Sequence, residues 1–373
     1  MDSLFVFILH AMYKTPNCTP SSFAKQHFLP EETVQEGVQF LCEKGFLAFV
    51  NGNCTITEKG LAFLSMQGTT GTFATADERQ TVLSLLCEAL QITADTVQHF
   101  VPMSVGMTNL SYIVQTANGS YIFRMPGVGT DKLIDRYREY SNYLAVEGAG
   151  IADVVVYHNP LTGVKITQYI PNCRTANPKS SKDISVCMSV LRQFHKSGLT
   201  VSHTFDFAQY IYYYEILCSQ QQVSFSPSHL QEKQAVQWLL SSLNKTEKEF
   251  CFCHIDSVPN NFLISSSGSV TLIDWEYAGM CDPLADVAMW CISAAYEKTE
   301  CDSILPAYLE REPTQNEWSR FYSYLSLGGF LWGLWAYYKA SFGATYGNYI
   351  NRMSAFCLQY YAYAQAAFTK NLS

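Results

Sequence analysis

The sequence lacks an excess of basic residues. Its 373 residues include 24 Lys and Arg against 32 Asp and Glu, so the formal net charge is −8. Binding to nucleic acid depends largely on basic side chains that neutralise phosphates. The charge therefore argues against a nucleic-acid partner held mainly by phosphate contacts. It suits a protein that binds cations, including Mg²⁺ and a positively charged substrate.

The sequence also lacks a disulfide framework and a targeting segment. Its 13 cysteines are scattered and odd in number, which predicts reduced thiols in a cytoplasmic protein. Cys251-x-Cys253-His254 has no second cysteine pair at zinc-finger spacing, so buried packing is predicted there. The apolar run at 4–9 is short and follows Asp2 rather than basic residues. Neither a signal peptide nor a membrane span is predicted from it.

The first 68 residues are predicted to form a winged helix-turn-helix domain. Polar caps and an early proline open two of its helices, and Asn51-Gly52-Asn53 indicates a hairpin turn. The predicted order is a helix near 3–14, a short helix to His27, a third helix from Leu29 to Gly45, strands at 46–50 and 54–57, and a last helix from Thr57.

The charges of this domain disfavour binding to DNA. Residues 1–70 contain four Lys against six Asp and Glu, and the third helix, which would enter a major groove, carries four Glu and one Lys. Major-groove binding needs Lys and Arg for phosphates and guanine edges. We expect a protein-contact or dimerisation module, with a homodimer as one form it would produce.

Residues 69–77 are predicted to be a linker, because Gly and Thr dominate its start. Beyond it, a helix is expected near 77–91, strands at 99–105, 110–116, 120–125, 153–157 and 164–169, and a helix near 131–147. This is the outline of a nucleotide-binding N-lobe over 78–170. Helices dominate 171–373, which predicts an α+β protein with a small β-rich lobe and a large helical C-lobe.

Two motifs in the C-lobe carry the chemistry. His254-x-Asp256-x4-Asn261 is followed, after a β-like segment, by Ile273-Asp274. Transfer of a phosphoryl group from a nucleotide to a hydroxyl needs a carboxylate that accepts the hydroxyl proton, and hard oxygen ligands for Mg²⁺ on the phosphates. Asp256 is predicted to be the base, and Asn261 and Asp274 the metal ligands. His254 is expected to brace the loop, since Asp256 already has the base role.

The N-lobe offers matching candidates for ATP. Arg124, at the end of a strand, is predicted to bind phosphate, and Glu139 to orient it through an ion pair; a surface Arg and a surface Glu are the alternative. Gln168, Tyr169 and Ile170 are expected at the hinge, where backbone groups would bind adenine. A loop with small polar residues would face the phosphates, although a plain β-turn would look the same; it comprises Ser104, Gly106, Thr108 and Asn109.

The run at 121–130 with 133–136 and Glu139 resembles the N-lobe of bacterial choline kinases. These belong to the choline/ethanolamine kinase and aminoglycoside phosphotransferase group, whose fold is that of protein kinases. The family's Asp-x-Val-Pro-x-Asn matches 256–261, its Ile-Asp-Trp-Glu-Tyr-x-Gly matches 273–279, and Asp282-Pro283 and Asp286 continue the match. The resemblance covers roughly residues 78–365 and implies that Asp286 supports the catalytic loop. Two departures are Ile255, where many members have Asn, and Ser293, near which eukaryotic members carry an acid.

The run Phe330-Leu331-Trp332-Gly333-Leu334-Trp335 is closely similar to one in choline kinases. Trp332 and Trp335 share a helix face and can hold a quaternary ammonium by cation–π attraction. Considered without the rest of the sequence, two tryptophans at this spacing would be interpreted as core residues. The resemblance implies that these tryptophans line the choline site, with Tyr349, or else Tyr346, completing the aromatic box. Glu276 is also assigned to the substrate site.

These observations predict ATP-dependent, Mg²⁺-assisted phosphorylation of choline to phosphocholine. Choline is preferred because a wall of paired tryptophans gains most from a methylated cation. Ethanolamine, whose ammonium donates three hydrogen bonds, is a close competitor. An aminoglycoside kinase would need many more acceptors. The competing class is a winged-helix regulator whose kinase-like domain senses a ligand without turnover, and the intact Asp256, Asn261 and Asp274 weigh against it.

Overall fold

The computed structural model describes residues 19–26, 31–50, 53–57, 76–103, 109–127 and 129–370. Within it the chain divides into two compact units. The first comprises the described residues up to 140 together with 154–169, and the second comprises 141–153 and the described residues from 170 onward. The predicted N-lobe, 78–170, is thus shared between the units, because 141–153 groups with the helical part.

The first unit begins with a helix pair and a hairpin. α2 (Pro20–Gln26) and α3 (Glu31–Glu43) precede β1 (Leu47–Val50), which pairs antiparallel with β2 (Asn53–Ile56). The apolar side of α3 is buried, as its spacing predicts. The other predicted parts of the winged helix lie outside the described residues, namely the helix near 3–14, the hairpin tip and the last helix, so the domain stays a prediction. The same holds for nearly all of the predicted linker.

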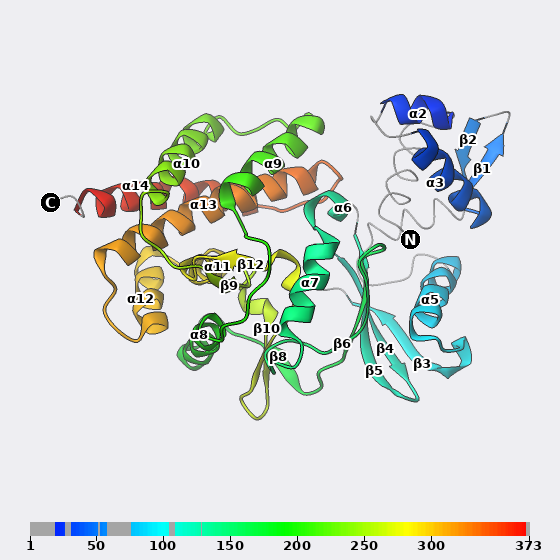
Figure 1. Cartoon of the computed structure of the whole chain (residues 1–373), viewed down its shortest axis with the longest axis horizontal. Helices are drawn as coiled ribbons and strands as arrows, with labels where there is room; N and C mark the ends of the chain where they lie inside the picture. The colour runs from blue at the N-terminus through cyan, green and yellow to red at the C-terminus, as the bar shows by residue number, and fades with distance from the viewer. Residues whose placement is uncertain are drawn as a thin grey trace. The chain divides into compact units, whose positions relative to one another are not determined.

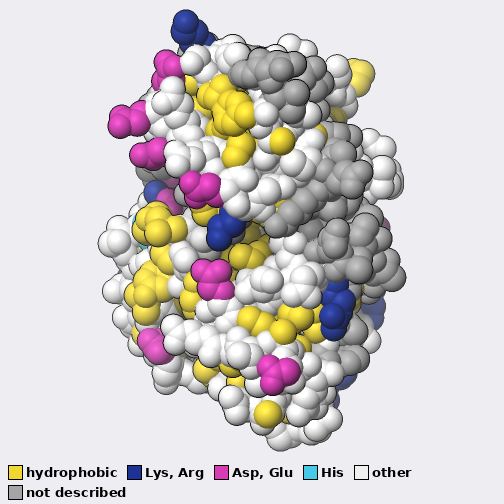
Figure 2. Space-filling view, turned by 90° about the vertical axis from the view of Figure 1, so that its right-hand side faces the viewer, with side chains coloured by type: hydrophobic (Ala, Val, Ile, Leu, Met, Phe, Trp, Pro, Cys, Tyr) yellow, Lys and Arg dark blue, Asp and Glu magenta, His cyan; other side chains and the backbone are white. Residues whose placement is uncertain are grey.

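The polar side of α3 is acidic. Its four glutamates, Glu31, Glu32, Glu36 and Glu43, are all exposed. Figure 2 shows Asp and Glu side chains on this side of the molecule, without a continuous basic patch among the described side chains in view. The exposed face of α3 is therefore unsuited to the phosphates of a nucleic acid.

An antiparallel five-stranded sheet forms the rest of the first unit, in the order β3-β4-β5-β7-β6 (Figure 1). Helix α5 (Ala76–Leu90) and the short η1 (Ala94–Thr96) precede it. The predicted strands are confirmed with shifts of one to three residues at their ends. Their bounds are β3 (Val97–Pro102), β4 (Asn109–Thr116), β5 (Gly119–Pro126), β6 (Val155–Asn159) and β7 (Val164–Gln168).

The prediction of a single helix near 131–147 was wrong, because the structure has two helices there. α6 (Thr130–Leu133) ends at Ile134, whose backbone is extended, and α7 (Arg136–Val146) begins anew. The carboxylate of Asp135 explains the break, since its Oδ1 accepts hydrogen bonds from the backbone N–H groups of Tyr137 and Arg138, both at 3.1 Å. This is N-terminal capping, which fixes where a helix starts.

The second unit is mainly helical, as predicted, with short strands and 3₁₀ turns that carry the sequence motifs (Figure 1). Strands pair antiparallel in the orders β11-β10-β8 and β12-β9. In chain order the elements are β8 (Cys173–Thr175), α8 (Ser181–His195), α9 (Phe207–Gln220), α10 (His229–Leu243), β9 (Cys251–Cys253), η2 (Pro259–Asn261), β10 (Phe262–Ser265), β11 (Val270–Leu272), η3 (Trp275–Tyr277), β12 (Gly279–Cys281), α11 (Leu284–Ser293), α12 (Lys298–Leu309), α13 (Gln315–Ala340) and α14 (Tyr349–Lys370).

The core of this unit is built on α13, which packs along α14 and α11. Small residues permit the close approach. A Cβ added to Gly329 would lie 2.7 Å from the backbone oxygen of Met353 and 2.8 Å from the backbone nitrogen of Cys357. Only glycine fits there, so α13 and α14 meet at backbone distance. Among the described helices, none is both long and apolar enough to cross a membrane.

Candidate active site

A buried ion-pair cluster in the first unit surrounds Glu139 on α7. Arg124 and Lys165 lie opposite each other on β5 and β7, so both side chains extend from the same face of the sheet. Arg124 forms an ion pair with Glu139 Oε1, and Lys165 Nζ lies 3.0 Å from the same oxygen. Arg136 Nη1 lies 2.8 Å from Oε2. The predicted Arg124–Glu139 contact is present, and two further cations accompany it.

The basic side chains of this cluster shift the pKa of its two other members. Burial alone would raise the pKa of Glu139, but Lys165, Arg124 and Arg136 hold it well below its usual value. His158, whose Nε2 lies 3.9 Å from Oε2, is neutral near pH 7, because burial lowers its pKa to about 4. Three basic side chains therefore surround the Glu139 carboxylate at a buried site, and clustered basic groups attract anions.

The other predicted nucleotide contacts are described in part. Ser104, Gly106 and Thr108 lie outside the described residues. Asn109 begins β4, and its Oδ1 accepts a hydrogen bond of 3.4 Å from Arg136 Nη2. This contact connects the end of the predicted phosphate loop to the cationic cluster.

The predicted hinge follows β7. The backbone N–H of Gln168 donates to Val154 and that of Tyr169 donates to Ser120, at 2.8 and 2.9 Å. Both groups are therefore used within the protein. Adenine contacts along 168–170 would have to use the remaining backbone groups, such as the N–H of Ile170.

In the second unit, Asp286 on α11 holds in place the loop at 254–261, which is predicted to be catalytic and is called the catalytic loop below. This fully buried carboxylate accepts hydrogen bonds from the backbone N–H of His254 at 2.8 Å and of Ile255 at 2.6 Å. It also lies 2.9 Å from His195 Nε2. Ile255 has a positive φ of 65°, a conformation that costs a β-branched residue about 1–3 kcal/mol. Asp286 thus bonds to the strained turn directly before Asp256.

His254 connects the loop to the strand that precedes Asp274. Its Nε2 lies 2.9 Å from the backbone oxygen of Ile273, so the ring donates a hydrogen bond to that oxygen. The rings of His254 and Trp275 meet in a T-shaped contact. Burial lowers the pKa of His254, which favours the neutral form of the imidazole. In this position the imidazole aligns the two motifs, consistent with bracing rather than with the role of base.

Asp256 and Asn261 face each other across the catalytic loop. Asn261 Nδ2 donates to Asp256 Oδ2 at 2.9 Å and to the backbone oxygen of Asp256 at 2.8 Å. The amide nitrogen makes both bonds, which leaves the amide oxygen Oδ1 as the atom that suits a metal ion. The bond to Oδ2 also fixes the orientation of the carboxylate.

Three carboxylates repel one another at this site. Burial raises the pKa of Asp256 well above its usual value, and the neighbouring Glu276 and Asp274 raise it further. Asp274 adopts a left-handed conformation, with φ 66°. Asn142 on α7 fixes the turn that follows, donating to the backbone oxygens of Trp275 and Ala278, each at 2.9 Å. An amide oxygen and crowded carboxylates are a donor set that fits Mg²⁺, which prefers oxygen ligands.

An aromatic group lies next to these carboxylates. The rings of Trp332 and Tyr277 meet edge to face, with centroids 5.1 Å apart, and Trp332 Nε1 donates to Met289 Sδ at 3.0 Å. Burial raises the pKa of Tyr277, and Tyr214, Glu276 and Asp256 raise it further. Tyr277 is therefore close to both the catalytic loop and the indole.

The second predicted indole has different neighbours. Trp335 packs against Tyr346, with centroids 5.5 Å apart, and Tyr346 contacts Tyr349 at 6.2 Å. The guanidinium of Arg352 lies over the ring of Tyr349 at 5.2 Å. One face of Tyr349 is thus already occupied by a cation. Of the two tyrosines considered from the sequence, Tyr346 is the one in ring contact with a tryptophan.

Several site residues were missed from the sequence. Lys165 and Arg136 are ordinary in sequence, and only strand pairing and the start of α7 bring them to Glu139. Asn142 lies far along the chain from the turn that it contacts at Trp275 and Ala278. Tyr277 was within the quoted Ile-Asp-Trp-Glu-Tyr motif, and its position directly after Glu276 was the signal that could have marked it.

Comparison with known proteins identifies the family of this chain. Residues 99–322 match the model of the phosphotransferase enzyme family. Protein LicA of Haemophilus influenzae is 28% identical over 271 residues, which cover 69% of this chain and 79% of that protein.

Solved structures show the same fold. The crystal structure of choline kinase LicA from Streptococcus pneumoniae superposes with a TM-score of 0.67 at 26% identity, over 76% of this chain and 99% of the other. A structure of LicA in complex with AMP gives a TM-score of 0.64 at 26% identity, over 76% of this chain and 98% of the other. The kinase-like fold predicted from the sequence is confirmed.

Proposed function

The chain belongs to the phosphotransferase enzyme family, and on this premise we propose that it is a cytoplasmic, ATP-dependent choline kinase. It would transfer the γ-phosphoryl group of ATP to the hydroxyl of choline. One observation carries the proposal: the paired Asp256 and Asn261 lie among crowded carboxylates, next to a buried aromatic group that begins with Tyr277. Phosphoryl transfer needs the carboxylates and the amide, and aromatic rings bind a methylated cation.

Asp256 acts as the base in this proposal. The hydroxyl oxygen of choline attacks the γ-phosphorus in line, its proton passes to the Asp256 carboxylate, and ADP leaves with the electron pair of the broken P–O bond. Asn261 orients the carboxylate through its bond to Oδ2. Asp286 and His254 are positioning residues, which hold the backbone of the loop and its distance from the Asp274 segment.

Asn261 and Asp274 are the residues that would hold Mg²⁺. When bound there, the ion supplies positive charge that offsets the charge of the nucleotide phosphates. It would also relieve the repulsion among Asp256, Asp274 and Glu276 that the pKa of Asp256 reflects.

The cationic cluster of the first unit supplies the nucleotide contacts. Arg124, Lys165 and Arg136 meet at one carboxylate and supply the basic groups that a polyphosphate needs. Glu139 keeps the three cations in a fixed arrangement. The predicted loop at 104–109 and the hinge at 168–170 would complete the nucleotide site.

The cation of the substrate meets aromatic rings and a carboxylate. Trp332 and Tyr277 present ring faces and edges beside Glu276, and Trp335 with Tyr346 and Tyr349 extends the aromatic group. A trimethylammonium group has no N–H to donate, so ring faces and the charge of Glu276 are the interactions available to it. The arrangement therefore favours choline over a cation that must be hydrogen-bonded on every side.

A coupled assay of ADP release with choline, ethanolamine and an aminoglycoside tests the proposal. Choline is expected to give the highest kcat/KM. Trp332→Ala should raise the KM for choline about two- to thirtyfold, the equivalent of one cation–π contact of about 0.5–2 kcal/mol, and should affect ethanolamine less. Asp256→Asn serves as the inactive reference.

The alternatives give distinct results in the same assay. Preference for ethanolamine, with equal losses in Trp332→Ala for both amines, would replace choline by ethanolamine. Turnover with the aminoglycoside alone would show that the acceptor is an aminoglycoside rather than choline or ethanolamine. ATP binding without turnover of any acceptor would favour the regulator.

A further inference from the structure

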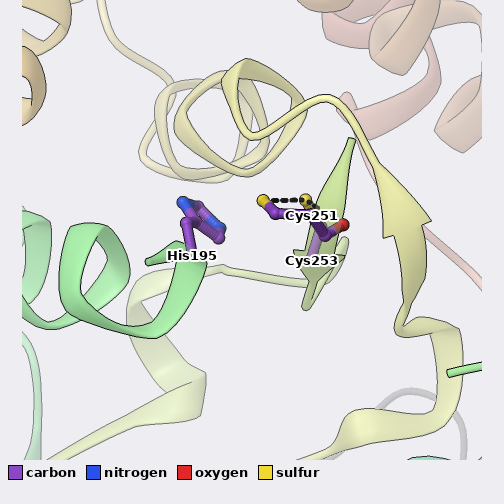
Figure 3. Close-up of side chains that lie close together, drawn as sticks. All are labelled: His195, Cys251 and Cys253. Carbon is purple, nitrogen blue, oxygen red and sulfur yellow. Dashed lines mark hydrogen bonds between the residues drawn. The ribbon is translucent and has the colours of Figure 1, made fainter. Parts of the chain in front are cut away.

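Three potential metal ligands meet behind the catalytic loop, outside the site described above. Cys251 and Cys253 are two residues apart on β9, so both side chains lie on one side of the strand. His195, the last residue of α8, points toward them (Figure 3). One ligand atom from each residue lies within 4.8 Å of the other two, and both cysteines are free thiols. The sequence had indicated buried packing around His254, but the histidine beside the thiols is His195.

The spacing of the two thiols fits a tetrahedral ion. With a Zn–S distance of roughly 2.3 Å and tetrahedral angles, two thiolates on one zinc ion are about 3.8 Å apart. The sulfurs of Cys251 and Cys253 are 3.6 Å apart. The strand thus already holds the pair at the separation that the ion requires. Cys253 is buried and Cys251 is half-buried, so one ligand is open to an entering ion.

The histidine is oriented as metal-binding histidines usually are. Its Nε2 lies 2.9 Å from the Asp286 carboxylate, and its Nδ1 lies 2.8 Å from the hydroxyl of Tyr308. A ligating imidazole commonly donates its other N–H to a carboxylate, which fixes the tautomer. Asp286 fills that role at Nε2 and leaves Nδ1 for the ion.

We propose that Cys251, Cys253 and His195 bind one thiophilic divalent cation of the Zn²⁺ class. The two thiols lose their protons to solvent as the metal–sulfur bonds form, and Nδ1 exchanges its contact with Tyr308 for the ion. The fourth position is left for water or for the displaced hydroxyl. Because Asp286 contacts His195 on one side and the catalytic loop on the other, the bound ion is connected to the loop through a single carboxylate.

Cadmium reports binding directly, because cadmium–thiolate bonds absorb in the ultraviolet. Cd²⁺ alone is titrated into the reduced, chelator-treated full chain. One equivalent should produce the absorption, and Cys251→Ser and Cys253→Ser should each abolish it. His195→Gln should weaken the affinity, because it removes one of the three protein ligands. Cys173→Ser is the matched control, since this half-buried thiol lies outside the cluster. It should leave the titration unchanged.

A second measurement needs no variant and so does not depend on the folding of the serine forms. Zn²⁺ should slow alkylation of Cys251 by iodoacetamide in the native chain, followed by peptide mass spectrometry, and should leave Cys173 unaffected. Equal alkylation of Cys251 with and without Zn²⁺ would overturn the proposal. An absorption that persists in both Cys251→Ser and Cys253→Ser would do the same. Neither measurement involves choline or ATP, so the result is independent of the proposed reaction.

Discussion

Asp286→Asn isolates the contribution of one buried carboxylate to the catalytic loop. Asp286 Oδ2 accepts from the N–H of His254 and lies against His195 Nε2, while Oδ1 accepts from the N–H of Ile255. An asparagine keeps the shape but has one acceptor oxygen. If that oxygen takes the Oδ2 position, it keeps two partners, and its NH₂ group then faces the N–H of Ile255. One hydrogen bond to a charged group is lost at the residue whose backbone is strained.

The size of the effect follows from that count. A hydrogen bond to a charged group contributes about 1.5–3 kcal/mol, and the left-handed conformation of Ile255 costs about 1–3 kcal/mol. The lost bond is therefore comparable with the strain that it offsets, and the turn before Asp256 should relax. At about 1.4 kcal/mol for each factor of ten, kcat should fall about ten- to 150-fold. The KM for ATP should change little, because the cationic cluster around Glu139 is untouched.

The matched control is Asp282→Asn. Asp282 is also fully buried, at the turn before α11, but its partners are the N–H of Leu284 at 3.0 Å and Arg320 at 2.6 Å. The Asp282→Asn variant should have a lower unfolding midpoint than the native enzyme but the same kcat. Steady-state kinetics and thermal unfolding of both variants check this. If Asp286→Asn loses stability like the control but keeps kcat within about threefold of the native enzyme, the loop does not depend on this carboxylate and the reasoning fails.

Three further predictions concern nucleotide binding, packing and pH. Lys165→Met should weaken the affinity for ATP, measured by calorimetry, about ten- to 150-fold, which is the value of one hydrogen bond to a charged group. Arg138→Gln, at an exposed position, should leave the affinity unchanged. Equal affinities of the Lys165→Met variant and the native chain would show that Lys165 is not part of the nucleotide site. Gly329→Ala should cost about 1–3 kcal/mol of unfolding free energy through overpacking, while Gly333→Ala, whose Cβ would lie 3.6 Å from Met353 Cβ, should be neutral or stabilising; a neutral Gly329→Ala would contradict the close helix contact. The hydrogen bond from Arg174 lowers the pKa of Asp183 to about 2, so the ionised carboxylate contributes fully to the free energy of unfolding above about pH 4, and this contribution is lost as the pH falls toward 2. Urea unfolding at a series of pH values should therefore show a smaller loss of stability in acid for Asp183→Asn than for the native chain. The same pH profile in both proteins would argue against the Arg174–Asp183 pair.

The sequence by itself determined the parts whose information is local. Asp256 and Asn261 lie five residues apart on one loop, and the strand pattern and turn glycines specify the hairpins that carry Arg124 and Asp274. The kinase-like fold followed from that order of elements and from the resemblance of two motifs. Composition alone also predicted the acidic face of α3, because the predicted third helix carries four glutamates and one lysine.

Tertiary structure decided what depends on distant partners. In the sequence Lys165 is an ordinary strand residue, yet the pairing of β5 with β7 places it opposite Arg124. A second cation therefore joins the Arg124–Glu139 ion pair. His195 reaches Asp286 and the two thiols only because the end of α8 packs against β9. The break before α7 depended on the side chain of Asp135, which competes with a continuous helix by capping a new one. Local patterns specify which elements form, whereas the energies that set a pKa, a strained turn or a metal-ligand distance arise from groups that folding brings together.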